Sequence, residues 1–463
     1  MLTSDQASEI FDKLRRHSTA DEVELLISSG SSALTRFANN TIHQNVAEEN
    51  TQISVRVSFG GRTARATTNK SDGDSLRRVV QSAEALARVQ QDDPDLLPMP
   101  TPQEARGGDA FVPTRSFEST ARLTPQDRAA AVAQMVDVAK RNRLTTAGVY
   151  SSSEVVEGIF NSRGVAHWYE QTLAEVSITM LDDTSSGWQK ANSPDARQVD
   201  HVRMAEVAAQ KAIDSPHPAE LPPGKYTVVL EPSAVLDAVG YMFWDFGGSA
   251  LLEQRSFLNE RIGKQLFGEN ITVWDDAYHP LQVGAPFDGE GVPRRRIQLI
   301  ERGIVKAVTY ARSSARRMAA SALAGNVGQV TATGHGFALP NEIGEAPMNI
   351  VFEAPQPDAS QSLEQMIAST GRGLLVTRLW YIREVDPYEK ILTGMTRDGT
   401  FLIENGKVQR GVRNFRFNES LIHMLQNVEA LGVPVRASGE ESMDMVVPAM
   451  KVRDFNFTEV TMF

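Results

Sequence analysis

The chain of 463 residues contains no cysteine and only eight histidines. The absence of cysteine excludes disulfides, thiolate nucleophiles and thiolate-bound metal sites. No two histidines lie within a helical turn of each other; they are His17, His43, His167, His201, His217, His279, His335 and His423. A metal site with two imidazoles on one helix is therefore excluded, and only histidines from distant segments could share a metal.

Long apolar runs are also missing. No apolar stretch approaches the ~20 residues that are needed to span a bilayer. The first residues, MLTSDQASEIFDKLRR, are mixed in charge and lack the apolar region of a secretory signal. The net charge of −11 disfavours nucleic acid as the main partner. The densest basic run, Arg294–Arg296, lies in an apparent strand pair and is more typical of a solvated hairpin face. We expect a cytoplasmic protein without membrane or nucleic-acid partners.

The first half of the chain repeats an order of elements. Units at about 5–90 and 127–213 each predict a helix, alternating strands and a second helix. In the second unit Thr124 can cap a helix whose first position is Pro125. The turn Asn39-Asn40 corresponds to Asn161-Ser162. The pattern favours an internal duplication, and chance similarity between short strands is the alternative.

Two segments rich in proline and glycine, 92–113 and 215–224, predict connections outside regular structure. Beyond residue 224, short runs alternate apolar and polar residues as strands do, with helices expected at 234–246, 361–369 and 419–431. The predicted class is α+β. An N-terminal α/β domain with an internal duplication covers 1–220, and a β-rich C-terminal domain covers 224–463.

Several segments of the C-terminal half carry a resemblance to a known family. These are RSFL (255–258), PFDGEGVPRRR (286–296), LIERGIVKA (299–307), ATGH (332–335), GRGLLVT (371–377) and DGTFLIENGKV (398–408), preceded by LTRFANNTIHQ (34–44). In this order they resemble the TldD/PmbA metallopeptidase family, over nearly the whole chain. Metal-binding members carry HExxxH on a helix that corresponds to 234–246, with a further cysteine ligand near the C-terminus.

This chain keeps the predicted helix but not the ligands. The family motif aligns with Leu236–Tyr241 or with Gly240–Asp245, and neither register contains histidine. Leu236, Gly240, Tyr241 and Asp245 therefore mark a degenerate metal-site helix. We expect no metal, no cofactor and no catalytic residue in this chain. The pattern is nearest the metal-free PmbA branch, also called TldE.

The resemblance implies a non-catalytic subunit of a zinc metallopeptidase complex acting on extended or unfolded peptides. Zinc would reside in a TldD-like paralogous partner, in a heterodimer or higher oligomer. One alternative is a homo-oligomer, such as a homodimer, that binds peptides or proteins without peptidase activity, as a gyrase modulator would. Another is a hydrolase with a Ser or Thr nucleophile, although no G-x-S-x-G elbow is present.

Two segments supply candidate peptide-binding or chamber-lining residues. Thr333, Gly334 and His335 lie in TATGHGFALPNE, where glycines permit close approach of a peptide strand; a strand end beside glycines is the structural alternative. Arg378 and Tyr381 lie in a strand rich in aromatic and basic residues. In PFDGEG, Asp288 and Glu290, with nearby Asp275-Asp276, could hold a cation, but a tight turn is the favoured interpretation.

Overall fold

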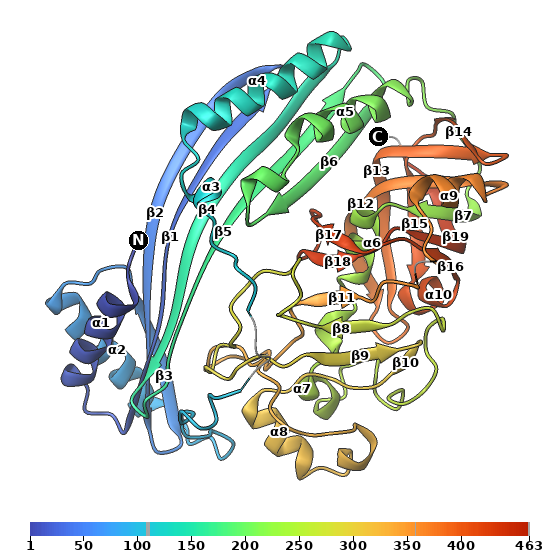
Figure 1. Cartoon of the computed structure of the whole chain (residues 1–463). Helices are drawn as coiled ribbons and strands as arrows, with labels where there is room; N and C mark the ends of the chain where they lie inside the picture. The colour runs from blue at the N-terminus through green and yellow to red at the C-terminus, as the bar shows by residue number, and fades with distance from the viewer. Residues whose placement is uncertain (108–111, 357, 462–463) are drawn as a thin grey trace.

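The chain forms two domains of mixed helix and strand, which confirms the predicted α+β class (Figure 1). The computed structural model describes residues 1–107, 112–356 and 358–461. The N-terminal domain comprises α1 (Ser4–His17), β1 (Glu22–Ala38), β2 (Thr41–Phe59), β3 (Arg62–Thr68), α2 (Gly73–Val89), α3 (Glu118–Ala121), α4 (Pro125–Arg141), β4 (Thr145–Asn161), β5 (Ala166–Leu181), β6 (Ser186–Ser193), η1 (Ala196–Gln198) and α5 (His201–Ile213).

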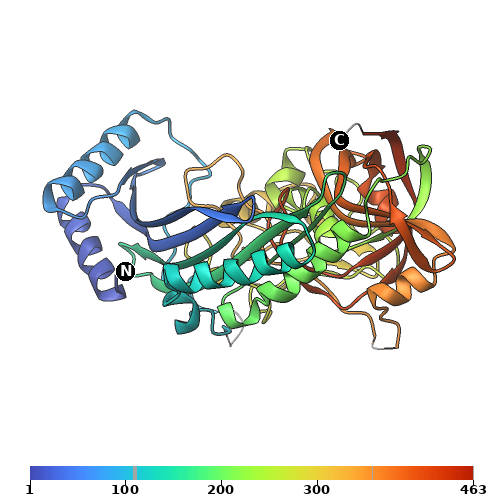
Figure 2. The same ribbon diagram turned by 90° about the horizontal axis from the view of Figure 1, so that it is seen from above.

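The N-terminal domain is one antiparallel sheet in the order β3-β2-β1-β4-β5-β6. Each half of the sheet has the order helix, three strands, helix, and β1 pairs with β4 where the halves meet. The strands are so long that each helix pair covers only one end. Helices α1 and α2 bury one apolar cluster, and α4 and α5 bury another at the opposite end (Figure 1). In the view from above, α4 and α5 lie side by side along the sheet (Figure 2).

Local sequence signals explain several boundaries of this domain. The Thr124 hydroxyl accepts a hydrogen bond from the Asp127 amide, and Pro125 takes the first helical position, which confirms the predicted start of α4. Asn39 and Asn40 have φ of 51° and 60° and form the two-residue turn between β1 and β2. Asparagine tolerates this left-handed conformation better than most residues.

The C-terminal domain contains two sheets. Its elements are β7 (Gly224–Leu230), α6 (Pro232–Val239), η2 (Phe243–Asp245), α7 (Gly248–Leu252), β8 (Val273–Asp275), β9 (Ile297–Glu301), β10 (Ile304–Val305), α8 (Arg312–Ala319), η3 (Ala324–Asn326), β11 (Ile350–Phe352), α9 (Leu363–Ala368), β12 (Arg372–Asp386), β13 (Ile391–Glu404), β14 (Lys407–Gly411), β15 (Phe415–Ser420), α10 (Leu421–Gln426), β16 (Val428–Leu431), β17 (Val435–Ala437), β18 (Met445–Val447) and β19 (Met450–Val460).

The larger of these sheets closes on itself. Its order is β12-β7-β19-β15-β13-β14, and β12 also pairs with β13 along most of its length, which completes a ring of strands. The second sheet has the order β10-β9-β8-β11-β18-β17. Apolar residues from both sheets and from α6 share one core. This core fixes α6 between the sheets.

Two expected helices are shorter than predicted. The helix expected at 234–246 ends at Val239, and after Gly240 the chain tightens into turns and the short η2. The helix expected at 419–431 ends at Gln426, because Val428–Leu431 pairs with β19 as β16. In the connection predicted at 92–113, Met99 and Ala105 are buried, and residues 108–111 lie outside the described part of the chain.

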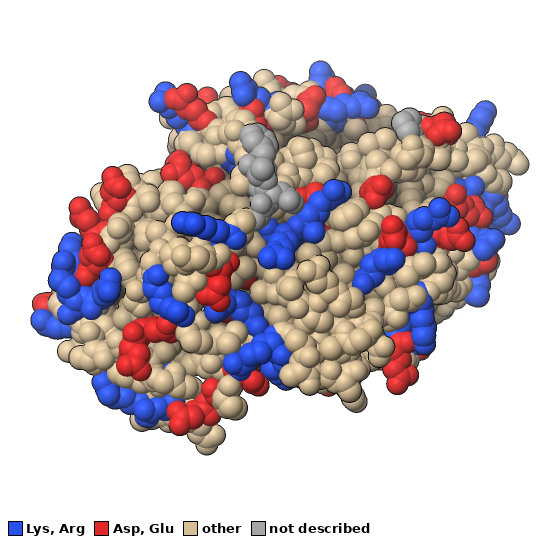
Figure 3. Space-filling view, turned by 60° about the horizontal axis from the view of Figure 1, so that its bottom comes forward, with Lys and Arg blue, Asp and Glu red and all other residues tan. Residues whose placement is uncertain are grey.

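The surface carries charges of both signs. Lys and Arg side chains are interspersed with Asp and Glu on the face shown in Figure 3. Of the basic run, Arg295 and Arg296 are exposed, whereas Arg294 is half-buried and donates from Nε to the carbonyl of Ala285. The run precedes β9 and lies outside a strand, so the expected hairpin face is not formed. In the described part of the chain, no helix is both long and apolar enough to cross a bilayer.

Candidate functional site

The degenerate metal-site helix is α6, which follows directly from the central strand β7. Its first turn is fixed by Glu231, whose carboxylate pairs with Lys211 of α5 at 2.8 Å and accepts from the Thr377 hydroxyl at 3.3 Å. Helix α6 packs against β12, β17 and β18. Both domains therefore contribute to its position.

The side chains at the motif positions, in α6 and in the turns that follow it, are already engaged. Leu236 is part of the apolar core. Asp237, which follows it, is fully buried and accepts hydrogen bonds from the amides of Leu379 and Glu441, both at 3.3 Å. Burial raises the pKa of the Asp237 carboxyl to about 7. The Tyr241 hydroxyl donates to the carbonyl of Ile382 at 3.1 Å, and Asp245 pairs with Lys390.

The space beside α6 is filled by residues 437–444, here called the capping segment. A Cβ on Gly439 would lie 2.3 Å from Asp237 Oδ1, and a Cβ on Gly240 would lie 1.7 Å from Ser442 Oγ. The glycine backbones of the two segments therefore lie directly against side chains of the other segment. Glycine at position 240 leaves room for Ser442, and glycine also weakens a helix, which is in line with the end of α6 at Val239.

These residues do not fit a metal ion. Leu236 offers no donor atom, the Asp237 oxygens already accept backbone hydrogen bonds, and the capping segment leaves no room at Gly240. Among the residues that the structure describes, no group of three or more His, Asp or Glu side chains could hold a metal elsewhere.

The N-terminal domain holds the capping segment in place. Lys190 of β6 donates to the carbonyl of Gly439 at 2.9 Å. Asn192 donates to Asp444 at 2.7 Å and accepts from Arg436 Nε at 2.6 Å. These contacts connect the long sheet to α6, the helix predicted to correspond to the metal-site helix.

His335 lies in a buried network that sequence spacing did not reveal. Its Nε2 lies 2.9 Å from Asp275 Oδ1, and its Nδ1 lies 2.9 Å from Thr333 Oγ1. The combination of hydroxyl, imidazole and carboxylate matches the residue types of a hydrolase triad. However, His335 is 1% exposed, and Thr333 Oγ1 also accepts from the Tyr310 amide at 2.7 Å. The arrangement is therefore closed to a substrate.

Asp275 was visible in the sequence only as a possible cation ligand. Its second oxygen accepts from the amides of Met348 and Asn349 at 2.7 and 2.8 Å. Although burial alone would raise the pKa of Asp275, the His335 ring lowers it overall. Gly334 is also constrained, because its φ is 73° and a Cβ there would lie 2.1 Å from the Pro293 carbonyl oxygen. The TATGHG segment is thus a tightly held loop.

PFDGEG forms a turn, in line with the favoured interpretation. Asp288 Oδ1 accepts from the amides of Glu290 and Val292, both at 2.9 Å, and Oδ2 accepts from the Gly336 amide at 2.8 Å. Burial raises the pKa of Asp288, and burial together with the Asp288 charge raises the pKa of Glu290 to about 7. Asp288 therefore closes its own turn and joins it to the loop of His335.

The two candidate residues on β12 lie in different environments. Arg378 is buried, pairs with Asp398 and stacks over Trp188 of β6, 4.5 Å from the ring centroid. Tyr381 is 53% exposed and has a φ of 55°, with its amide donating to Glu441 at 2.7 Å. Arg378 thus joins the two domains, and peptide contact at Tyr381 stays a prediction.

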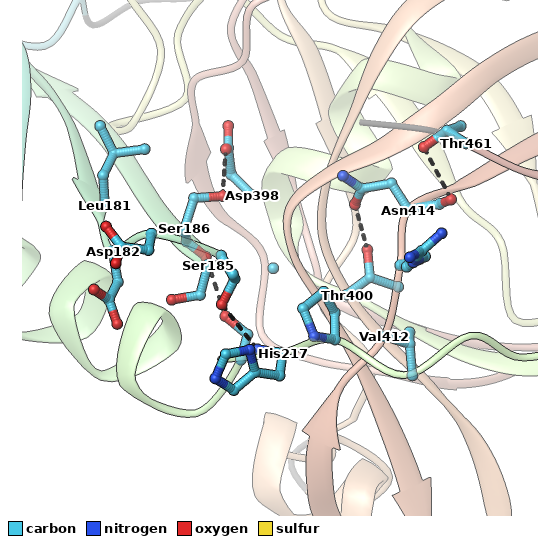
Figure 4. Close-up of a pocket in the computed structure, with 16 residues that line it drawn as sticks. Leu181, Asp182, Ser185, Ser186, His217, Asp398, Thr400, Val412, Asn414 and Thr461 are labelled. Carbon is cyan, nitrogen blue, oxygen red and sulfur yellow. Dashed lines mark hydrogen bonds between the residues drawn. The ribbon is translucent and has the colours of Figure 1, made fainter.

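A polar pocket of about 800 Å³ opens beside this junction (Figure 4). The β5–β6 turn forms one wall, and the residues around β13 and β14 form the other. The Ser186 hydroxyl donates to Asp398 at 2.8 Å across the domain boundary. On the other wall, Thr400 and Thr461 donate to Asn414 at 3.2 and 3.1 Å. These hydroxyls thus already donate to carboxylate, amide or carbonyl oxygens of the protein.

Comparison with known proteins gives one consistent result. Residues 223–459 match the PmbA/TldA metallopeptidase C-terminal domain, and residues 23–87 match PmbA/TldA metallopeptidase domain 1. Metalloprotease PmbA of Escherichia coli O157:H7 is 23% identical over 86% of this chain and 85% of its own length. The Metalloprotease PmbA homolog of Haemophilus influenzae is 20% identical over 94% of this chain and 95% of its own length.

Solved structures share the fold. TldE from Thermococcus kodakarensis superimposes with a TM-score of 0.84 at 19% identity, covering 98% of this chain and 99% of the other. A putative modulator of a DNA gyrase from Thermotoga maritima gives 0.83 at 18% identity, covering 98% and 100%. Because the C-terminal family match alone spans more than half of the sequence, the chain belongs to the PmbA/TldD family.

Proposed function

We propose that this protein is the non-catalytic, PmbA/TldE-like subunit of a cytoplasmic zinc metallopeptidase complex that acts on extended or unfolded peptides. The observation that carries the proposal is the packing of α6 and of the turns after it. By the resemblance, α6 and the turns after it correspond to the family's metal-site helix, and the residues at the motif positions are engaged in packing and hydrogen bonds. A scaffold retained without histidine ligands is expected where a partner supplies the chemistry.

The zinc-bearing partner would be a TldD-like paralogue. In such a subunit the metal would polarise the scissile carbonyl and activate water. In this chain, the Lys190 and Asn192 contacts hold the capping segment rigidly against α6. That rigidity supports a structural role, in which this subunit walls the chamber and presents the peptide to its partner.

The test is co-expression with a paralogue that carries HExxxH and cysteine. We expect the two chains to purify together, with one zinc-bearing subunit for each copy of this chain, and to cleave an unfolded peptide that neither chain cleaves alone. The matched control is a partner whose motif glutamate is replaced by glutamine, which should assemble but not cleave.

Two outcomes would overturn the proposal. One is stoichiometric zinc and peptidase activity in this chain purified alone. The other is a stable homodimer that ignores the paralogue, which would favour the alternative of a peptide- or protein-binding homo-oligomer. Two solved structures with this fold are described as putative modulators of DNA gyrase, and that description is in line with the alternative.

A further inference from the structure

A second cleft lies between the long sheet and the loops of the C-terminal domain. Its volume is about 560 Å³, within the range of sites for small ligands and short peptides. On the sheet side, Gln52, Ser28 and Glu157 stand opposite one another on β2, β1 and β4. On the loop side, Phe287 and Phe337 give the cleft an apolar wall.

The apolar wall is built by the buried networks around His335 and Asp288. Asp288 accepts from the Gly336 amide, and the Gly289 amide donates to the Gly336 carbonyl at 2.9 Å, so the loops of Phe287 and Phe337 are joined. Asp275 holds the amides of Met348 and Asn349, which also line the cleft. These networks fix the shape of the wall before any ligand arrives.

Two polar groups in the cleft have unused capacity for hydrogen bonds. Arg294 Nη1 is buried and has no hydrogen-bond partner in the described part of the chain. Glu157 is accessible inside the cleft, and its carboxylate accepts no hydrogen bond from the described residues. The surrounding protein displaces enough water to raise the pKa of the Glu157 carboxyl, an effect that Arg294 partly offsets. Because the half-buried Arg294 side chain lines the cleft, a ligand that accepts from its guanidinium would pair a donor that the described residues leave unsatisfied, which would stabilise the complex.

We propose that this cleft binds an extended peptide segment with apolar side chains. A peptide backbone carries the required pair of groups, because its carbonyl can accept from Arg294 and its N–H can donate to Glu157. Its apolar side chains would contact Phe287 and Phe337, which a purely polar ligand would leave exposed. A free carboxylate fits less well, since it would meet the Glu157 charge. This proposal rests on the peptide-handling role proposed above and assigns it a place.

The test measures binding to this chain alone, by fluorescence anisotropy. The probe is a short, labelled, end-blocked peptide in which leucines alternate with serines, and the control peptide has asparagine in place of leucine. Ser28→Trp should fill the cleft and abolish binding of the leucine peptide. Ser32→Trp, on the same face of β1 but outside the cleft, should leave binding unchanged. Arg294→Met should weaken binding about tenfold, the loss expected for one buried hydrogen bond, without preventing folding.

The proposal fails if neither peptide binds, or if Ser28→Trp binds as wild type does. It also fails if a fluorescent fatty acid competes fully and Arg294→Met has no effect, because the cleft would then be a plain apolar pocket. Failure of the function proposed above would give a different set of results. Peptide binding without assembly with the paralogue would overturn the proposed complex. An active complex in which this chain alone binds no peptide would overturn the proposed role of the cleft.

Discussion

At the residue scale, Asp237 links the degenerate metal position to a measurable pH dependence. In the unfolded chain an aspartate ionises near pH 4, whereas burial raises the pKa of Asp237 to about 7. Between these values the folded state retains a proton that the unfolded state releases. The contribution of Asp237 to the free energy of unfolding therefore falls as pH rises from about 4 to about 7.

Asp237→Asn should flatten this dependence. Between pH 5 and pH 8 the free energy of unfolding of the wild type should fall. Since one pKa unit corresponds to about 1.4 kcal/mol, we expect this fall to be smaller by roughly 2 kcal/mol or more in the variant. Urea unfolding at both pH values measures the effect. Asp137→Asn, on the exposed face of α4, is the control and should leave the slope unchanged. An unaltered slope in Asp237→Asn would mean that the carboxyl stays ionised despite its burial.

The His335–Asp275 pair gives a second prediction at this scale. Both side chains are fully buried, so His335→Ala leaves the Asp275 carboxylate without its partner. We expect a loss of about 3–5 kcal/mol in the free energy of unfolding. Adding Asp275→Asn should recover part of the loss, because the neutral amide is cheaper to bury. His43→Ala on the exposed part of β2 should change stability by no more than about 0.5 kcal/mol. Equal effects of His335→Ala and His43→Ala would contradict the role of the pair.

Sequence spacing identified residue types at the site but not their contacts. His335 is a candidate from its glycine neighbours, yet its partner Asp275 is sixty positions away at the end of β8 and meets it only in the folded chain. Likewise, nothing in the local pattern around Arg378 indicates the Trp188 ring, which comes from the other domain. Contacts set by long-range pairing cannot be read from a short window of sequence.

At the scale of the element, the contact between α6 and the capping segment depends on Gly240. Its φ is −58°, which any residue adopts, so an added methyl group is opposed only by Ser442. Gly240→Ala should destabilise the protein by about 1–3 kcal/mol through overpacking. Ser442→Gly should restore much of the loss in the double variant. Gly371→Ala, where a Cβ meets open space, is the matched control in thermal unfolding. Without rescue by Ser442→Gly, the contact would not be the cause.

The same contact predicts that restoring histidines will not restore a metal site. A variant with Leu236→His and Tyr241→His places imidazoles at the motif positions, but α6 ends at Val239 and the capping segment fills the adjacent space. We expect far less than one zinc for each chain after purification, measured by elemental analysis. Stoichiometric zinc would contradict the conclusion that the packing, and not only the missing ligands, excludes the metal.

Elements were predictable where periodicity and local signals agreed. The start of α4 at Thr124-Pro125 needs only residues within the helix. The end of α6 lies against the Ser442 side chain, about two hundred residues later in the chain, and Val428–Leu431 becomes a strand because β19 is available for pairing. Apolar spacing is similar for a short buried helix and a short buried strand, so tertiary pairing decides between them.

At the scale of the whole molecule, Arg378 is one of the residues that join the two domains. Its guanidinium stacks over Trp188 of the long sheet, and it pairs with Asp398, which in turn accepts from Ser186 of the same sheet. Because the two domains have separate apolar cores, contacts of this kind are needed to make them unfold together.

Arg378→Ala should therefore uncouple the domains. We expect calorimetry to show a lower first transition and a second, separate one, with the calorimetric enthalpy exceeding the van't Hoff enthalpy more than in wild type. Arg378→Lys keeps the charge near Asp398 but loses the planar stack on Trp188, so it should give an intermediate result. Arg397→Ala is the control, because Arg397 contacts Trp380 and Asp398 within the C-terminal domain only. If Arg378→Ala and Arg397→Ala unfold alike, other contacts between the domains, such as the Lys211–Glu231 pair and the hydrogen bonds of Lys190 and Asn192, must carry the coupling.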